Sequence, residues 1–213
     1  MRLQRLTGCS KLRSEGVNLR SEPPRRKPRT PDFVLTMDEI RAVTAFALTS
    51  AEQVLPLFEA CHPEDSRPRD ALAAAAAFVH GDRRSRAQRV TAIAAHRAGR
   101  EAAAPVAFHA AMAAGDAAAS AYLHPLADAV QVNHILRAPA HTIRAFELSP
   151  SEEYAGDLIE RIVDFATPLL IDVLRRYPRI PAGANRVSQL VHELDNRLRD
   201  QSCTSPMRQS EGR

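Results

Sequence analysis

The chain has 213 residues, of which 45% are hydrophobic and only 5% aromatic, with eight glycines and no tryptophan. Its apolar content comes mainly from alanine, leucine and valine, which favours helix–helix packing over a β-sandwich. The net charge of +4 would indicate a nucleic-acid partner if it were spread over the chain, but residues 1–30 hold nine basic and two acidic residues, a net of +7, which leaves −3 for the rest.

The N-terminal segment is the first predicted element. Four prolines lie in residues 21–31 among like charges, a composition that neither nucleates a helix nor buries a core. We therefore expect residues 1–31 to form a disordered basic tail. Residues 33–200 are expected to form one helical domain, and the polar residues 201–213 a second disordered tail.

A capping box marks the start of the first predicted helix. The hydroxyl of Thr36 and the carboxylate of Glu39 can satisfy backbone amides of the first turn, and Leu35 is placed to pack on Ile40. Apolar residues then recur at spacings of three and four, which is typical of one helical face. Pro56 is expected to kink or split this helix.

Two further helices are predicted before the centre of the chain. The second begins near Pro68, a favourable first-turn residue, and stops at Gly81. The third runs from about residue 85 to residue 103. Its apolar spacing predicts an inward face made of Val90, Ile93, Ala94 and Arg97.

Prolines open the two central helices in this prediction. The fourth helix is expected over residues 105–122, and the fifth over residues 125–146, continuing past Pro139. Small residues fill positions 110–121, so a neighbouring helix can approach closely. Gly115 weakens the fourth helix by up to about 1 kcal/mol relative to alanine.

The C-terminal part is predicted to contain the last two helical segments. The sequence Ser-Pro-Ser-Glu at 149–152 is expected to cap a segment over residues 158–177, which Pro168 interrupts. A rigid connector then leads to a helix capped by Asn185, with an apolar stripe of Val187, Leu190, Val191, Leu194 and Leu198. The sequence therefore predicts an all-α fold, a single compact multi-helix bundle of about six to eight helices.

Cysteine usage and hydropathy indicate the cellular compartment. Cys9, Cys61 and Cys203 form no CxxC pair, and two of them lie in the expected tails, so neither a disulfide framework nor a zinc site is predicted. A reduced, cytoplasmic setting fits best. No apolar stretch approaches the roughly 18 to 20 residues of a membrane helix, so no membrane partner is expected.

The sequence contains none of the common catalytic motifs. Neither GxxxxGK[ST] nor GxGxxG occurs, which argues against a phosphate-binding loop, and neither GxSxG nor HExxH occurs either. We therefore expect a protein that is not an enzyme.

Histidines offer the one route to a metal site. Five of them fall in the central helices with two carboxylates among them: His96, His109, His124, His134 and His141, with Asp116 and Asp128. Facing helices could bring several of these side chains onto a metal. The spacings along each helix are seven rather than three or four, so we expect hydrogen-bonded or solvated histidines. A helical metal-dependent hydrolase that uses His109, His124 and His134 stays open as the alternative.

A basic cluster is the main candidate for partner binding. Arg83, Arg84, Arg86 and Arg89 come together, and helical spacing puts His96 and Arg100 on the same side as Arg89. Such a stripe can follow a phosphate backbone, but it lacks interleaved aromatics and is flanked by acidic residues, so a solvated or partner-facing helix surface is favoured. Nucleic-acid binding through this cluster and the basic tail is a further alternative. The candidate partner-binding residues are Arg83, Arg84, Arg86, Arg89, His96, Arg100, Tyr122, His124 and His134.

Six segments carry a family resemblance. They lie at residues 38–47, 54–60, 70–75, 94–98, 114–124 and 173–178, and the fifth reads Ala-Gly-Asp-Ala-Ala-Ala-Ser-Ala-Tyr-Leu-His. Together they resemble a family of bacterial putative immunity proteins, the immunity-protein-five-like group of polymorphic-toxin systems. The resemblance covers about residues 33–200 and rests on helical packing segments rather than a catalytic signature. It implies an α-helical cytoplasmic protein that binds and blocks a cognate toxin without a cofactor. Many members have Gly-His where this chain has Gly115-Asp116.

Overall fold

The structure is a computed structural model that describes residues 32–149 and 157–201. These residues form nine α-helices and two short 3-10 helices, with no strand among them, which confirms the all-α prediction. The number of α-helices exceeds the expected range by one. The expected tails lie outside the described residues, except for Gln201. In the described part of the chain, no helix is both long enough and apolar enough to cross a membrane.

Helix α1 (Met37–Glu52) begins as predicted. The amide of Glu39 donates to Oγ1 of Thr36 over 3.2 Å, and the amide of Thr36 donates to Oε2 of Glu39 over 2.7 Å. Leu35 packs against the cluster that contains Ile40. The predicted split is confirmed, because α2 (Leu55–Cys61) is a separate helix with Pro56 in its first turn, where its missing amide costs no hydrogen bond.

Helices α3 (Arg67–Val79) and α4 (Arg86–Glu101) follow close to their predicted bounds. Gly81, with φ of 114°, lies in the turn between them. The predicted inward face of α4 is wrong. Val90 is 50% exposed and Ile93 54% exposed, while four of the five buried residues of the helix are alanine or glycine.

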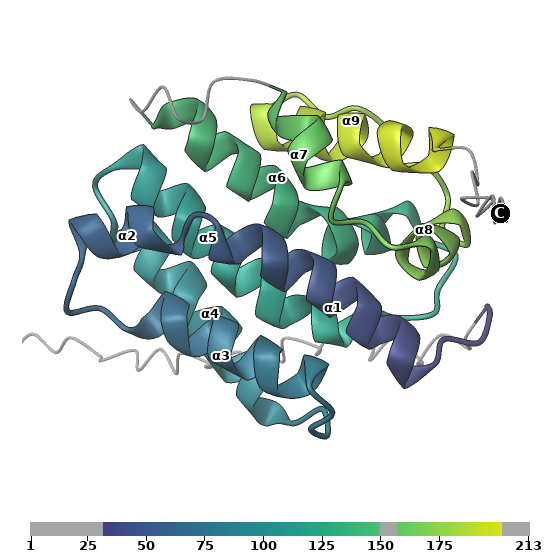
Figure 1. Cartoon of the computed structure of the whole chain (residues 1–213), viewed down its shortest axis with the longest axis horizontal. Helices are drawn as coiled ribbons and strands as arrows, with labels where there is room; N and C mark the ends of the chain where they lie inside the picture. Colours follow the sequence, from purple (N-terminus) through teal and green to yellow (C-terminus); the bar gives the residue numbers. More distant parts are fainter. Residues whose placement is uncertain (1–31, 150–156, 202–213) are drawn as a thin grey trace, which may run out of the picture.

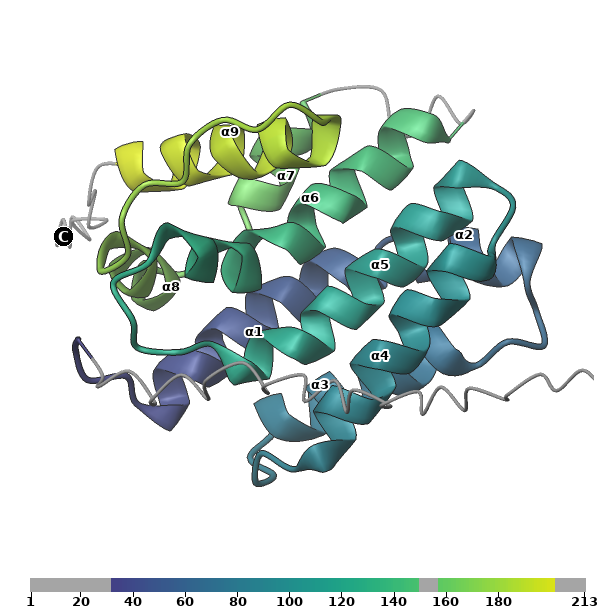
Figure 2. The ribbon, with the colours of Figure 1, turned by 180° about the vertical axis from the view of Figure 1, so that it is seen from behind.

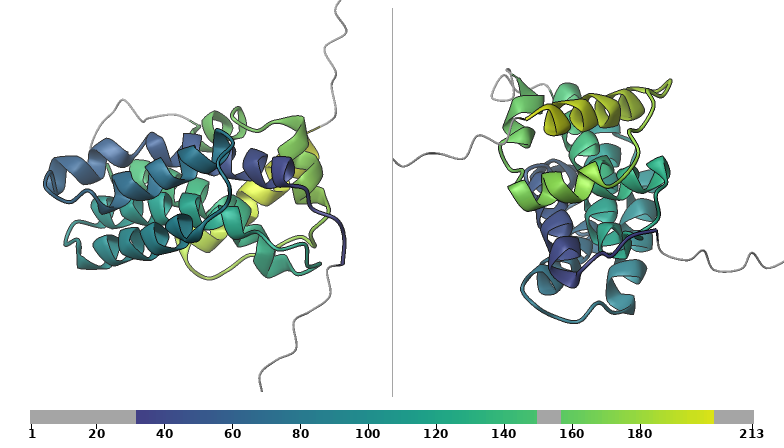
Figure 3. Two further views of the ribbon diagram at one scale, coloured as in Figure 1. Left: turned by 90° about the horizontal axis from the view of Figure 1, so that it is seen from below. Right: turned by 90° about the vertical axis from the view of Figure 1, so that its right-hand side faces the viewer.

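Helix α5 (Pro105–Ala119) explains why α4 is turned in this way. It lies at the centre of the fold and contacts α1, α2, α3, α4 and α6 (Val132–Leu148). Seen from behind, α4, α5 and α6 lie side by side, with α1 and α3 on the far side (Figures 1 and 2). The view from below shows these two layers edge-on (Figure 3). The alanine-rich α5 accepts only the small side of α4, so the larger apolar residues of α4 face outward.

Glycines set the close approach of α4 and α5. A Cβ atom on Gly115 would lie 2.3 Å from Cδ2 of His96 and 3.0 Å from the carbonyl oxygen of Ala92, both on α4. A Cβ atom on Gly99 would lie 3.1 Å from the carbonyl oxygen of Phe108 on α5. A methyl group on Gly115 would force the His96 ring to shift, and one on Gly99 would press on the backbone of α5.

The substitution Gly115→Ala is therefore expected to lower the free energy of unfolding by about 1–2 kcal/mol, although alanine is the better helix former by about 1 kcal/mol. The added methyl group displaces His96. Chemical denaturation measures the change. In a His96→Ala background, the same glycine substitution should cost much less, since its main obstacle is gone. A Gly115→Ala protein more stable than the wild type would contradict this explanation.

The connection between α5 and α6 corrects a second prediction. After η1 (Ser120–Tyr122) the chain runs without helix through residues 123–128, and η2 (Ala129–Gln131) then leads into α6, so Pro125 does not open a helix. Asp32 holds this segment, because its amide donates to the carbonyl of Pro125 over 2.8 Å and its Oδ2 accepts from the amide of Ala127 over 2.7 Å. The predicted continuation of α6 past Pro139 is confirmed.

The C-terminal helices are α7 (Leu158–Val163), α8 (Pro168–Arg175) and α9 (Arg186–Asp200). Pro168 begins α8, as the predicted interruption requires. The predicted cap at 149–152 lies outside the described residues apart from Ser149, which ends α6, and Asp157 caps α7 instead. Asn185 caps α9 as predicted, accepting from the amide of Ser188 over 2.9 Å.

Two large hydrophobic clusters form most of the core of the described residues, beside a small third cluster of Ile40, Phe78 and Ala121. One is built mainly from alanines of α3, α4 and α5 around Phe58. The other consists of leucine, isoleucine and valine side chains of α6, α8 and α9 around Tyr177. The alanine-rich composition therefore belongs to one half of the fold, where helices approach most closely.

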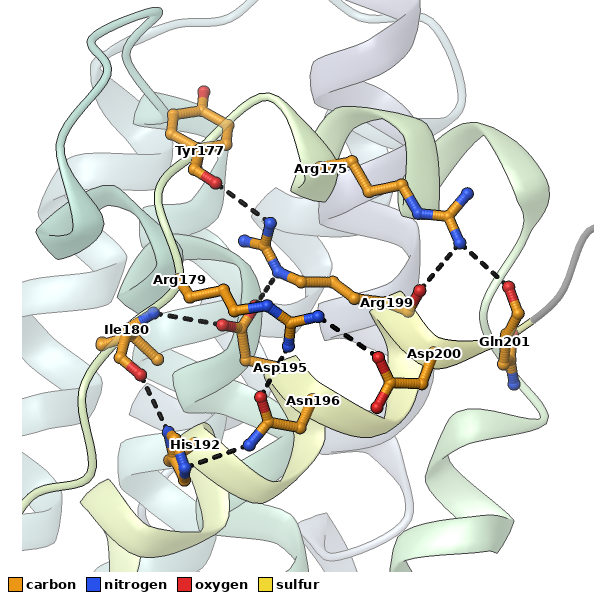
Figure 4. A network of polar contacts seen from close by, with 10 residues as sticks. All are labelled: Arg175, Tyr177, Arg179, Ile180, His192, Asp195, Asn196, Arg199, Asp200 and Gln201. Atoms are coloured by element: carbon orange, nitrogen blue, oxygen red, sulfur yellow. Dashed lines mark hydrogen bonds and ion pairs between the residues drawn. The ribbon is translucent and has the colours of Figure 1, made fainter.

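A buried ion pair fastens α9 to the chain that precedes it. Nε of Arg199 donates to Oδ1 of Asp195 over 2.6 Å, and both side chains are almost fully buried. The other oxygen of Asp195 accepts from the amide of Ile180, and Nη1 of Arg199 donates to the carbonyl of Tyr177 (Figure 4). His192 extends this network, with Nδ1 2.8 Å from the carbonyl oxygen of Ile180. The connector after α8 is thus tied to α9 by directed polar contacts.

Candidate functional site

The outward side of α4 carries a concentration of positive charge around two exposed apolar residues. We call it the α4 basic face. Its members are Arg83, Arg84, Arg86, Arg89, Arg97 and Arg100, with Val90 and Ile93. Within residues 32–149 and 157–201, no carboxylate forms an ion pair with any of these six arginines. The face therefore has unneutralised charge at its rim and apolar surface at its centre.

Tyr122 joins this face from η1. The guanidinium carbons of Arg84 and Arg89 lie 5.4 and 4.8 Å from the centre of its ring, and its hydroxyl donates to the carbonyl of Ser85 over 2.7 Å. The tyrosine thus connects η1 to the start of α4. The sequence cluster lacks interleaved aromatics, but tertiary folding places this one between two arginines.

His96 points away from the α4 basic face, into the contact between α4 and α5. Its Nε2 lies 3.1 Å from Oδ1 of Asp116, which requires the imidazole to donate. The other oxygen of Asp116 lies 3.5 Å from Nε of Arg137 and 3.8 Å from Nε2 of His141. Two helices, α4 and α6, therefore direct positive or donor groups at one buried carboxylate on α5.

His141 continues this arrangement to His109. Their Nδ1 atoms are 2.8 Å apart, so one ring must donate and the other accept. If His141 keeps its proton on Nε2, facing Asp116, its Nδ1 accepts from Nδ1–H of His109, and Nε2 of His109 is left as an acceptor. With this assignment of protons, the contacts of Asp116, His141 and His109 are mutually compatible. The series His96, Asp116, His141 and His109 is called the histidine–aspartate chain below.

Burial is the largest influence on the pKa values of His109, Asp116 and His141. It lowers the pKa of His141 to about 3, with Asp116 offsetting only part of the effect, and it lowers the pKa of His109 to about 4. It would raise the pKa of Asp116, but the hydrogen bond from His96 and the charge of Arg137 outweigh it and leave that pKa below its usual value. At neutral pH, the carboxylate is therefore ionised and the two facing imidazoles are neutral.

These pKa values predict a loss of stability in mild acid. Above pH 6.5 the two imidazoles are neutral whether the chain is folded or not, and below it only the unfolded chain takes up their protons. Between pH 7.5 and pH 5, the buried His141 should therefore reduce the free energy of unfolding by about 2 kcal/mol. The partly exposed His109 should add less, and burial also lowers the pKa of His134, which acts in the same direction.

Urea titrations at the two pH values measure this loss. In a His141→Gln variant the drop should be smaller by about 2 kcal/mol, because the group that protonates only on unfolding is gone. An equal drop in wild type and variant would refute the assignment of this acid sensitivity to His141.

The predicted site residues separate into groups. Arg83, Arg84, Arg86, Arg89, Arg100 and Tyr122 gather on or beside the α4 basic face. His96 belongs to the histidine–aspartate chain, His134 is on α6, and His124 lies in the connection before it. The alternative set of His109, His124 and His134 does not gather, because His109 pairs with His141. In the part of the chain that the structure describes, no three or more His, Cys, Asp or Glu side chains are placed to hold a metal ion.

An open groove of about 560 Å³ adjoins the histidine–aspartate chain. Helices α5 and α6 and the first turn of α9 line it, and the lining includes His109, the buried His141 and three arginines, Arg137, Arg144 and Arg186. Sequence reasoning missed this site, because its members come from helices far apart in the chain. It also missed the exposed Val90, Ile93 and Arg97, whose spacing is typical of a buried face.

Comparison with known proteins gives one match. A model of the family described as Imm-5 like putative immunity protein matches residues 34–165, which include the α4 basic face and the histidine–aspartate chain. No curated protein and no solved structure matches the chain.

Proposed function

The chain belongs to the Imm-5 like putative immunity protein family, and from this membership we propose that it binds and neutralises a cognate bacterial toxin. The proposal assigns this activity to residues 33–200, in the cytoplasm of a bacterium that carries a polymorphic-toxin system. Neutralisation is by occlusion: the protein covers the active site of the toxin, performs no catalysis and needs no cofactor.

The observation that carries the proposal is the α4 basic face. Val90 and Ile93 expose about half of their surface, although nothing in the described residues requires large apolar side chains there. Burying each against a partner contributes on the order of 1 kcal/mol, and arginine is enriched among the residues that dominate the affinity of protein–protein interfaces. We therefore propose that this face is the docking surface.

The charge of this face defines the partner. Arg86, Arg97 and Arg100 have no carboxylate partner within the described residues, so the complementary surface on the toxin is acidic. Opposite charges of this kind raise the association rate and select the partner. Ordered helices present these side chains, so docking requires little rearrangement of the backbone. His96, His124 and His134 are not needed for this contact.

A nucleic acid is the second candidate partner, and Tyr122 is the observation that favours it. An aromatic ring between Arg84 and Arg89 suits stacked bases and phosphates. The exposed Val90 and Ile93 have no role in contacting a phosphate backbone, which favours a protein partner. Binding to DNA or RNA that weakens steeply with salt and depends on these two arginines would select the second candidate.

A pull-down tests the proposal. The tagged full chain is expressed with the genes that neighbour its own, and the retained proteins are identified. We expect retention of one toxin-domain protein at physiological salt, and loss of it with an Arg86→Glu, Arg97→Glu variant. An Arg69→Glu variant on α3 serves as the matched control and should retain the toxin. Failure of the wild type to retain any toxin from such cells would overturn the proposal.

A further inference from the structure

The groove between α5, α6 and α9 has the size and the mixed lining of a small-molecule site. Its volume of about 560 Å³ lies within the range of ligand pockets in proteins. Phe108 and Met112 of α5 and Val187 of α9 give it an apolar wall. These three helices lie next to one another on the back of the molecule (Figure 2). The groove is formed without α4, so it is separate from the α4 basic face.

The polar side of the groove is positively charged. Arg137, Arg144 and Arg186 line it, and no carboxylate does. Glu147 orients two of these cations from outside the lining, through contacts of 2.8 Å to Arg144 and 2.6 Å to Arg186. Arg137 differs, because only its Nε approaches a carboxylate oxygen, that of Asp116 at 3.5 Å. Its terminal nitrogens have no partner within the described residues and are free to pair with an acid group.

A hydrogen-bond acceptor accompanies these cations. In the tautomers assigned above, Nε2 of His109 carries a lone pair, and no described residue donates to it. Both His109 and His141 line the groove. Because the two rings are neutral at neutral pH, they add no charge to repel Arg137. The groove therefore offers a guanidinium to an acid group and an imidazole nitrogen to a hydroxyl.

The histidine–aspartate chain behind the groove lowers the stability of the fold more than a purely structural feature needs to. Oδ2 of Asp116 is one of two buried side-chain polar atoms in the described residues that lack a hydrogen-bond partner. Two imidazoles beside it are kept neutral by burial, where apolar side chains would pack at lower cost. Buried polar atoms without a partner and strongly shifted pKa values are concentrated at functional sites, where function is retained at the expense of stability.

We propose that this groove binds a small organic acid that carries a hydroxyl group on an apolar ring or chain. The acid, a carboxylate or a phosphate monoester, pairs with Arg137, and Arg144 and Arg186 add to the attraction. The hydroxyl donates to Nε2 of His109, and the apolar body rests on Phe108 and Met112. Asp116 and His141 act as positioning residues, because they hold Arg137 and His109 without touching the ligand.

Calorimetric titration of the purified full chain tests the proposal. The probes are benzoate, the three hydroxybenzoate isomers, phenyl phosphate and inorganic phosphate. We expect saturable binding of phenyl phosphate and of at least one hydroxybenzoate, with dissociation constants of roughly millimolar or below. Inorganic phosphate, which has no apolar body, should bind at least about tenfold more weakly. A preference between carboxylate and phosphate probes identifies which acid the groove selects.

Three variants locate the binding. Arg137→Gln should weaken every organic probe by about tenfold or more, whereas Arg69→Gln on α3, outside the groove lining and the α4 basic face, should leave binding unchanged. His109→Phe should remove the advantage of the hydroxybenzoate over benzoate. Circular dichroism verifies that each variant is folded. No saturable binding of any organic probe, or binding that Arg137→Gln leaves intact, would overturn the proposal, as would a hydroxyl advantage that persists in His109→Phe.

Discussion

Replacing Asp195 by alanine should lower the free energy of unfolding by about 3–5 kcal/mol, the largest stability effect we expect from one substitution. The change leaves the guanidinium of Arg199 buried without its ion pair and the amide of Ile180 without its acceptor. An uncompensated charge in the interior costs far more than the pair contributes when intact. Urea denaturation followed by circular dichroism measures the loss.

Asp200→Ala is the matched control for this prediction. Asp200 lies one turn further along α9 and pairs with Arg179, but both side chains are mostly exposed to solvent. Its removal should cost less than about 1 kcal/mol. The double change Asp195→Leu, Arg199→Met removes both buried charges and should restore much of the lost stability. Equal losses from Asp195→Ala and Asp200→Ala would show that the buried network does not hold α9.

The pair of changes Val90→Asp and Ile93→Asp should weaken toxin binding by a hundredfold or more, about 2.8 kcal/mol. Both side chains lie at the centre of the α4 basic face, where a partner removes them from water. Each aspartate would have to lose its hydration on docking and would meet the acidic surface that we propose for the toxin. Calorimetry with an inactive toxin measures the change in affinity.

The same substitutions should leave folding unchanged, because both residues are about half exposed in the free protein. Thermal unfolding verifies this. Leu169→Asp is the control, since Leu169 is 41% exposed on α8 and that helix does not belong to the proposed docking surface. A double variant that binds the toxin as tightly as the wild type would place the contact on another surface.

Local signals in the sequence predicted the helix starts well. The capping box of Thr36 and Glu39 and the cap at Asn185 depend on residues within one turn, so the sequence alone defines them. Pro125 was misleading for the opposite reason. Its context resembles a helix start, but contacts from Asp32, more than ninety residues away, hold the segment in another conformation.

Apolar periodicity failed on α4 because it assumes that the largest apolar residues face inward. The neighbouring helix α5 determines which side of α4 is buried. Against most of the alanines of α5 only alanine and glycine of α4 fit, and Gly115 makes room for His96, so Val90 and Ile93 are left outside. Their exposure, which the sequence pattern hides, is the main support for a docking surface.

The histidine–aspartate chain was also beyond sequence reasoning. His109 and His141 are thirty-two residues apart, on different helices, and neither has a ligand-like neighbour at helical spacing. Their pairing depends on how α5 and α6 pack. The sequence predicted that histidines of the central helices could meet, but not that His141 would be the partner of His109.

The most direct test of toxin neutralisation is the growth of cells that express the toxin retained in the pull-down. Cells that make the toxin alone should stop growing, and cells that also make the full chain should grow normally. The Val90→Asp, Ile93→Asp variant, produced at the same level, should fail to restore growth. Toxin-expressing cells that die equally with and without the wild-type chain would contradict the proposed function.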